Sequence, residues 1–172
     1  TFKKQKGLQV VISSLPDVVS RIPDARLIVV GRGEPGDKER TEGLVKNLKL
    51  EKNVEFWGQK QNKEVLKIVS QANLLVVAEQ WFSDFGPVAL VEAMAQATPV
   101  VSGDLGSPPD FIRDGSNGFL AEYNNPKSFA EKIIYLLENK EKAKEIGNRA
   151  KETVKNIFSG DQQGEILKLY TL

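Results

Sequence analysis

The stretch "NLLVVAEQWFSDFGPVALVEAMAQATPVVSG", residues 73–103, joins two apolar runs through a segment of helical period. The runs are "NLLVVA" (73–78) and "TPVVSG" (98–103), both rich in branched residues. The continuous apolar character of "LLVV" is typical of a strand buried on both faces. Between them, Val88, Val91 and Ala95 recur at the spacing of one helix face. A buried strand, a helix and a second buried strand predict a parallel sheet.

The rest of the chain repeats this alternation. Further strand-like runs are "RLIVVG" (26–31), "NVEFWG" (53–58) and the weaker "GFLAE" (118–122). Helical stripes lie between them, at Leu44, Leu48 and Leu50, and at Val65, Ile68 and Val69. The sequence therefore predicts an α/β fold with helices on both faces of a parallel sheet.

The two ends of the sequence are expected to be mainly helical. Apolar positions from Leu8 to Val19 favour a helix, although Pro16 leaves open a strand followed by a short helix. The segment "NPKSFAEKIIYLLENK" predicts a helix with proline in its first turn. Residues 140–158 predict a charged helix ending at Ile157 and Phe158.

Composition excludes several classes of chemistry. The chain has 172 residues, 40% of them hydrophobic, which suffices for one domain with its own core. It contains no histidine and no cysteine, so thiol catalysis, histidine base catalysis and the usual zinc sites cannot be built. Lysine and arginine total 24 against 23 aspartate and glutamate residues, a balance that does not suggest nucleic-acid binding.

The sequence also bears on location. No apolar run approaches the roughly 20 residues that a membrane-spanning helix needs, and the lysine-rich start lacks the apolar core of a signal peptide. We therefore expect a cytoplasmic protein. The first residue is Thr1 rather than methionine, which fits a piece of a longer protein, tag removal or processing.

A glycine-rich loop follows the run at 26–31. Gly31, Gly33 and Gly36 have the G-x-G-x-x-G spacing of a dinucleotide site. The acidic residue expected about 20 positions later falls at Glu51, before a strand rather than at its end. This mismatch favours a tight strand-to-helix turn over a dinucleotide site.

Glu92 is a single carboxylate in an almost wholly apolar helix pattern. A charged group at such a position must be paired, exposed on a narrow free side, or directed at a ligand. Its spacing alone leaves a structural hydrogen-bonding role and a binding role equally open.

Six motifs occur in the same order and at similar spacing in a known family. They are "KG" near the start, "ARLIVVGRG", "NVEFWG", "NLLVVAEQW", "FGPVALVEAMAQATPVV" and "IRDGSNGFL". Over nearly its whole length the chain resembles the C-terminal domain of retaining glycosyltransferases of family 4, which have GT-B architecture. The resemblance implies a Rossmann-like, doubly wound parallel sheet, and residues 1–172 as a single donor-binding domain of a two-domain enzyme.

The resemblance assigns roles to two acidic positions. Glu92 matches the family glutamate that holds the ribose hydroxyls, a bidentate and charge-assisted contact. The family's other glutamate contacts the sugar, and here the matching position is Asp84 or Ser83, depending on the alignment. Pro87 removes one backbone N–H from the turn that offers amides to the donor. The sugar contact therefore differs from the family pattern.

Lys6 in "KG" matches the family lysine that pairs with the donor diphosphate, although "KKQK" is also compatible with a solvated loop. The partner arginine of the family, on a "GR" strand end before this lysine, is absent from the chain, as is the strand that carries it. In a sheet of order 3-2-1-4-5-6 this first strand is central. The resemblance thus implies half of a GT-B fold that lacks its first strand.

The remaining expected donor contacts come from loops and one helix start. By resemblance, the donor cleft is lined by Gly31, Gly33, Gly58, Gln59, Phe85, Gly86 and Val88. Trp57, beside this group, is expected in the core rather than under the nucleobase.

The resemblance implies transfer of a glycosyl group from a nucleotide diphosphate sugar with retention of configuration, without metal or cofactor. Lys6 and Asp84 are its candidate catalytic residues. The acceptor, a glycan or lipid, would be held by a separate N-terminal half, with peripheral membrane association of the longer protein, so this chain should bind donor without turnover. The alternatives are a nucleotide-binding or scaffold module without transfer activity, and a nucleotide-sugar epimerase or hydrolase of the same architecture.

Overall fold

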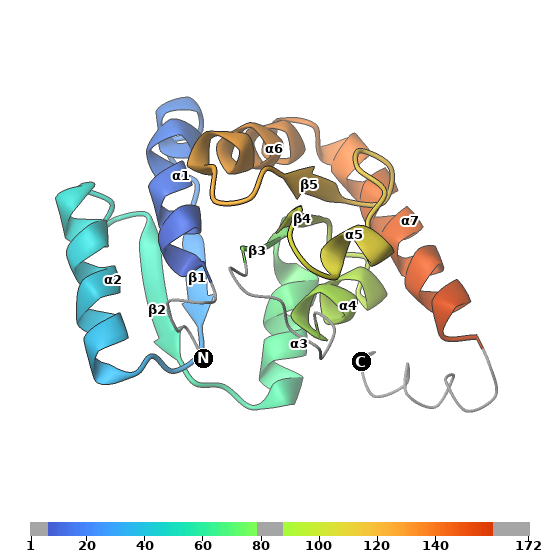
Figure 1. Cartoon of the computed structure of the whole chain (residues 1–172), viewed down its shortest axis with the longest axis horizontal. Coiled ribbons are helices and arrows are strands. Elements are labelled where there is room, and N and C mark those ends of the chain that lie inside the picture. Colours follow the sequence, from blue (N-terminus) through green and yellow to red (C-terminus); the bar gives the residue numbers. More distant parts are fainter. Residues whose placement is uncertain (1–6, 79–87, 160–172) are drawn as a thin grey trace.

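The computed structural model describes residues 7–78 and 88–159, without the side chain of Pro35 (Figure 1). Helices and strands alternate over most of this length. The helices are α1 (Leu8–Arg21), α2 (Pro35–Asn47), α3 (Asn62–Gln71), α4 (Val88–Ala95), α5 (Pro108–Phe111), α6 (Pro126–Glu138) and α7 (Lys140–Ile157). The strands are β1 (Leu27–Val30), β2 (Val54–Gly58), β3 (Leu75–Val77), β4 (Val100–Gly103) and β5 (Phe119–Ala121).

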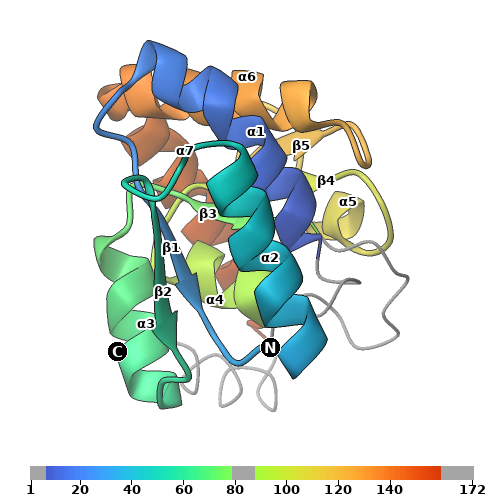
Figure 2. The same cartoon turned by 90° about the vertical axis from the view of Figure 1, so that its left-hand side faces the viewer.

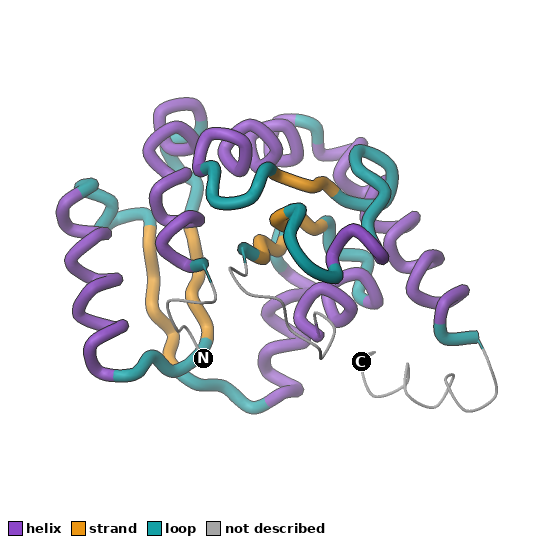
Figure 3. Tube along the Cα trace, viewed as in Figure 1, coloured by secondary structure: helices purple, strands orange, loops and turns teal. Residues whose placement is uncertain are grey.

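All strand pairs in the described residues are parallel, which confirms the predicted fold class. They form two sheets, β1–β2 and β3–β4–β5, rather than one. Figure 3 shows the two groups of strands apart from each other. The division falls between β1 and β3, where the order 3-2-1-4-5-6 places the first strand of a doubly wound sheet. Among the described residues, no strand pairs with both β1 and β3.

Helix α1 confirms the favoured helical prediction for the N-terminal segment. It continues through Pro16, and its buried Ser14 hydroxyl donates to the Val11 carbonyl oxygen at 2.7 Å. The helix follows Gly7, whose φ of 65° lies in the left-handed region that glycine tolerates. A Cβ on Gly7 would lie 1.5 Å from the carbonyl oxygen of Ala78, so only glycine fits between α1 and the end of β3.

One buried hydrophobic cluster connects both sheets. It contains Val29 and Val54 from the first sheet, Val101 from the second, and the buried faces of α1 and α6. Figure 2 shows α1 and α2 on the same side of the β1–β2 pair. A second cluster lies around α4 and contains residues of β3 and α7. The two sheets thus share one core, although within residues 7–78 and 88–159 no strand ladder joins them.

Helix α4 is held tightly against α7 and β4. Ala97, just after α4, has a φ of 59°, a left-handed conformation that is uncommon for a residue with a side chain. A Cβ on Gly147 of α7 would lie 2.1 Å from the Ala97 carbonyl oxygen. The buried Thr98 hydroxyl donates to the Val69 carbonyl oxygen at 2.9 Å and ties this turn to α3.

The first sheet leaves part of one face open, and the expectation for Trp57 is wrong. The residue is 42% exposed, and Ile28 on the neighbouring strand is 39% exposed. The Trp57 indole N–H donates to a Glu55 carboxylate oxygen at 3.0 Å. This hydrogen bond, together with Arg26, lowers the pKa of Glu55. Trp57 therefore belongs to a polar surface network.

The C-terminal third forms as predicted. Pro126 opens α6, and the Asn125 side chain accepts hydrogen bonds from the backbone N–H groups of Lys127 and Ser128. Asn117, in the turn before β5, accepts from the Arg113 backbone N–H at 2.7 Å. Its side-chain amide also donates to the Phe111 carbonyl oxygen of α5 at 3.0 Å and to the Thr153 hydroxyl of α7 at 2.9 Å, which ties this turn to both helices.

None of the helices in the described part of the chain has the length and apolar character needed to cross a membrane.

Candidate functional site

The carboxyl ends of β1 and β2 are joined through two glycines. The Gly31 backbone N–H donates to the Gly58 carbonyl oxygen at 2.8 Å, so the loops after both strands are in contact. Gly31 and Gly58 have φ values of 138° and 69°, which explains glycine at both positions. Gly58 and the next residue, Gln59, are exposed, and Gly33 is half-buried. Because ligands of doubly wound sheets bind at the carboxyl ends of strands, this is the expected edge for a site.

The G-x-G-x-x-G spacing does not form a phosphate cradle here. Gly36 lies in the first turn of α2, with Glu34 at the N-cap and Asp37 in the first turn. Two carboxylates near a helix N-terminus disfavour a bound anion, because their negative charges repel it and offset the positive end of the helix dipole. The structure therefore agrees with the strand-to-helix turn inferred from the sequence.

Glu92 is a buried carboxylate without a partner among the described residues. It lies in the second turn of α4, is 8% exposed, and its neighbours along the helix are also buried. Its side chain has no hydrogen bond or ion pair within residues 7–78 and 88–159. Burial raises the pKa of Glu92 above the ordinary value of 4.5. A carboxylate kept in this environment is available to hydrogen-bond donors of a ligand.

The start of α4 is open to solvent. Val88 is 51% exposed, whereas Leu90 is fully buried, so the helix enters the core within its first turn. The apolar pattern of the sequence predicts Val88 on the buried face of the helix. In the structure the buried part of α4 begins only at Leu90. The exposed first turn and buried Glu92 lie on the helix that follows β3.

Several predicted contacts lie outside the described residues. These are Lys6, Ser83, Asp84, Phe85, Gly86 and Pro87. Gly7, the neighbour of Lys6 in the chain, is described and lies against the Ala78 carbonyl oxygen at the end of β3. The predicted site residues that the structure describes therefore lie at the ends of β1 and β2 and on α4.

The sequence reading missed two polar residues at the same edge of the second sheet. Asp104 directly follows β4, is exposed, and accepts a hydrogen bond from the Tyr123 backbone N–H at 2.7 Å. Tyr123 lies just beyond β5 and is 44% exposed. Both residues directly follow strand-like runs of the sequence. This position could have identified them as candidates, since ligands bind at the carboxyl ends of strands.

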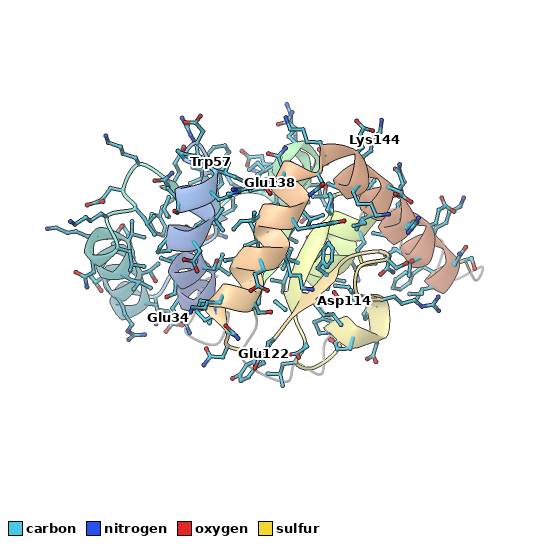
Figure 4. The ribbon with its side chains drawn as sticks, turned by 90° about the horizontal axis from the view of Figure 1, so that it is seen from above. Glu34, Trp57, Asp114, Glu122, Glu138 and Lys144 are labelled. Atoms are coloured by element: carbon cyan, nitrogen blue, oxygen red, sulfur yellow. The ribbon has the colours of Figure 1, made fainter. Side chains whose placement is uncertain are left out.

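An open depression lies elsewhere, at the junction of α6 and α7. It is lined by Glu138, Asn139, Lys140, Glu141, Lys142 and Glu145. In Figure 4, Glu138 lies on the opposite margin of the molecule from Glu34 and Glu122, which follow β1 and β5. Within the described residues no cluster of acidic side chains could hold a metal ion.

Known proteins similar to this chain are glycosyltransferases or their relatives. The family model described as glycosyl transferases group 1 matches residues 1–153. N-acetyl-alpha-D-glucosaminyl L-malate synthase of Bacillus anthracis is 32% identical over 161 residues, covering 94% of this chain and 40% of that protein. An uncharacterized glycosyltransferase of Methanocaldococcus jannaschii is 34% identical over 156 residues, covering 91% of this chain and 42% of that protein.

Solved structures share the fold. Anabaena HepE in complex with UDP-glucose superposes with a TM-score of 0.83 at 24% identity, covering 97% of this chain and 46% of that one. The C-terminal domain of a glycosyl transferase group 1 family protein from Francisella tularensis gives a TM-score of 0.81 at 26% identity, covering 90% of this chain and 80% of that one.

The parallel strands, the alternating helices and these neighbours define a Rossmann-like half of the GT-B type. The chain belongs to the glycosyl transferases group 1 family. It spans less than half the length of the curated relatives it matches, with 40% and 42% of the two named above.

Proposed function

We propose that this chain is the donor-binding, C-terminal half of a retaining glycosyltransferase of family 4. It binds a nucleotide diphosphate sugar at the edge formed by the carboxyl ends of its strands. The observation that carries the proposal is Glu92, a buried carboxylate with no partner among the described residues, on the helix that follows β3. The likeness to a solved C-terminal domain supports the same half of the enzyme.

In this proposal the two ribose hydroxyls of the donor donate to the Glu92 carboxylate. A charged acceptor between two hydroxyls makes a strong bidentate contact, and the ligand compensates the burial of the carboxylate. The glycines at the ends of β1 and β2 leave the backbone accessible to the nucleoside.

The transfer chemistry is mainly electrostatic in this proposal. Lys6 neutralises the leaving diphosphate, and Asp84 or Ser83 contacts the sugar. A fixed cation beside a developing negative charge stabilises the transition state without a metal ion. The acceptor, a glycan or lipid, is held by another part of the longer protein, and we expect donor binding by this chain without turnover.

Titration calorimetry with UDP, GDP and ADP sugars tests the proposal. Glu92→Ala should weaken binding by roughly tenfold or more, as expected when a charged hydrogen-bond partner is lost. Glu131→Ala, an exposed site on α6, is the matched control and should leave affinity unchanged. A folded sample that binds none of the three nucleotide sugars, or a Glu92→Ala variant of unchanged affinity, would refute the proposal.

Lys6→Ala separates the diphosphate from the nucleoside. We expect this variant to bind UDP or GDP more weakly while its affinity for the matching nucleoside persists, because only the diphosphate interacts with the lysine. Equal loss for both ligands would contradict the role of Lys6. Chelation with EDTA should leave binding unchanged, and a loss of binding would contradict metal independence.

A further inference from the structure

We propose that Asn117 and Gly118 form a latent deamidation site, which the turn before β5 holds in an unreactive arrangement and which reacts when this turn opens from α7. The site is independent of the proposed nucleotide site. The pair Asn–Gly occurs once in the sequence, within "DGSNGFL" at 114–120, so a modified peptide from this region identifies it without ambiguity.

An asparagine followed by glycine is chemically labile. Because glycine has no Cβ, its backbone nitrogen can approach the side-chain carbonyl carbon of the residue before it. Attack joins the Gly118 nitrogen to the Cγ of Asn117, and the side-chain nitrogen leaves as ammonia with the proton of the Gly118 N–H. Water then opens the cyclic imide at either of its carbonyl groups, which leaves aspartate or isoaspartate. Solvent water is thus the only other reactant.

The packing of β4 requires glycine at position 118. A Cβ there would lie 3.3 Å from the Val100 carbonyl oxygen and 3.3 Å from two side-chain carbons of Ile112. Val100 is fully buried and Ile112 is 3% exposed, so neither has free space into which it could withdraw. The fold therefore keeps the residue that makes Asn117 reactive.

The hydrogen bonds of Asn117 hold its carboxamide away from the reacting nitrogen. The Oδ1 atom accepts from the Arg113 N–H at 2.7 Å, and Nδ2 donates to the carbonyl oxygen of Phe111 and to the hydroxyl of Thr153. These partners belong to earlier residues and to α7, whereas the reaction requires Cγ to turn toward the following residue. Asn117 is also 3% exposed, which limits the access of water. The closed turn is therefore unreactive.

The contact between this turn and α7 controls the reaction. The Thr153 hydroxyl donates to the Arg149 carbonyl oxygen at 2.9 Å, which leaves its lone pairs for the Asn117 amide. When the turn separates from α7, Asn117 loses this partner and becomes exposed to water. Local opening of a surface turn costs less free energy than global unfolding, so the rate of deamidation should follow this opening.

The product cannot restore the original contacts. Aspartate at position 117 still accepts from the Arg113 N–H, but its carboxylate cannot donate to the Phe111 carbonyl, and its charge would be buried. Isoaspartate in addition lengthens the backbone of the turn by one atom. Because the lost ammonia is not replaced, the turn stays loosened after the reaction.

The first test compares the folded chain with a synthetic peptide of residues 113–121 in the same mildly alkaline buffer. Mass spectrometry of proteolytic fragments follows the conversion of Asn117 over time. We expect Asn117 to react at least about tenfold faster in the peptide than in the folded chain. Equal rates, or no conversion in the peptide, would overturn the proposal.

The second test weakens the contact with α7. Thr153→Val removes the acceptor of the Asn117 amide and should speed deamidation in the folded chain by about threefold or more, the effect of one lost hydrogen bond. Thr41→Val on α2 is the matched control, because both hydroxyls donate to the carbonyl oxygen four residues earlier. An unchanged rate in Thr153→Val, or an equal increase in Thr41→Val, would show that this contact does not control the reaction and would overturn the proposal.

The third test uses Asn117→Asp, which reproduces one of the two products. The Gly115 N–H donates to the Gly118 carbonyl oxygen at 2.8 Å within the turn. We expect the amide hydrogen of Gly115 to exchange several-fold faster in Asn117→Asp than in the wild type, as measured by NMR. Unchanged exchange would show that the product keeps the turn closed, and would overturn the lasting effect of the reaction.

Discussion

Replacing Glu92 by methionine should stabilise the empty protein. The side chain is 8% exposed and burial raises the pKa of its carboxyl group, so the folded protein holds the ionised form at a cost. Burying a polar group costs about 1–3 kcal/mol in mutational data, which methionine of similar length would remove. For a chain of this size the melting temperature should rise by roughly 3 °C for each kcal/mol.

The stability that Glu92→Met gains over the wild type should increase as pH rises. Burial raises the pKa of Glu92, so the folded state binds more protons than the unfolded state between the ordinary value of 4.5 and the raised one. The contribution of Glu92 to the free energy of unfolding therefore falls as pH rises through this window. Below it both states are protonated, and the advantage of the Glu92→Met variant should be smallest.

Urea unfolding of the wild type and of Glu92→Met, from about pH 4 to about pH 8, measures this effect. Glu131→Met on the exposed side of α6 is the control and should change stability by less than about 0.5 kcal/mol at each pH. The reasoning is refuted if Glu92→Met is less stable than wild type at neutral pH, or if its advantage does not change with pH.

Two further pairs of substitutions, each a test with its control, examine the packing around α7. Gly147→Ala should reduce the free energy of unfolding by about 2 kcal/mol or more, because its Cβ would lie 2.1 Å from the Ala97 carbonyl oxygen. Gly43→Ala in α2 meets no atom within 4 Å and should instead stabilise by about 0.5–1 kcal/mol; thermal unfolding compares the pair, and equal effects would contradict the close contact. Asn117→Ala removes three hydrogen bonds of a buried side chain and should cost about 2 kcal/mol, whereas Asn139→Ala, at an exposed single bond, should cost less than about 1 kcal/mol. A smaller loss at Asn117 than at Asn139 in chemical denaturation would show that the turn before β5 is not held by these bonds.

The elements of the fold could be predicted because their apolar patterns are local. The five strands lie within the predicted runs, and α1 forms through Pro16 because its buried face packs against α6. The exposure of Trp57 could not be predicted in the same way. The pattern of β2 identifies a strand, but whether a neighbouring element covers each of its faces depends on tertiary packing.

Part of the candidate site could be predicted because it also depends on local features of the sequence. Glycines at the ends of β1 and β2 can be read from the sequence, since backbone conformation requires them there. For Glu92, spacing alone could not separate a structural hydrogen bond from ligand binding. The structure bears on that choice, because within the described residues the carboxylate is buried and has no protein partner. Asp104 and Tyr123 approach each other only through the pairing of β4 with β5, which no local pattern reveals.

The left-handed conformation of Ala97 has a consequence for engineering. An alanine with a φ of 59° is in a strained backbone conformation that its surroundings impose. This strain costs about 1 kcal/mol of folding free energy, which glycine would avoid. Ala97→Gly would therefore give the domain a reserve of stability without altering a side chain at the strand ends. Such a background could tolerate damaging changes elsewhere, and would make a suitable parent in which weakened binding variants stay folded during measurement.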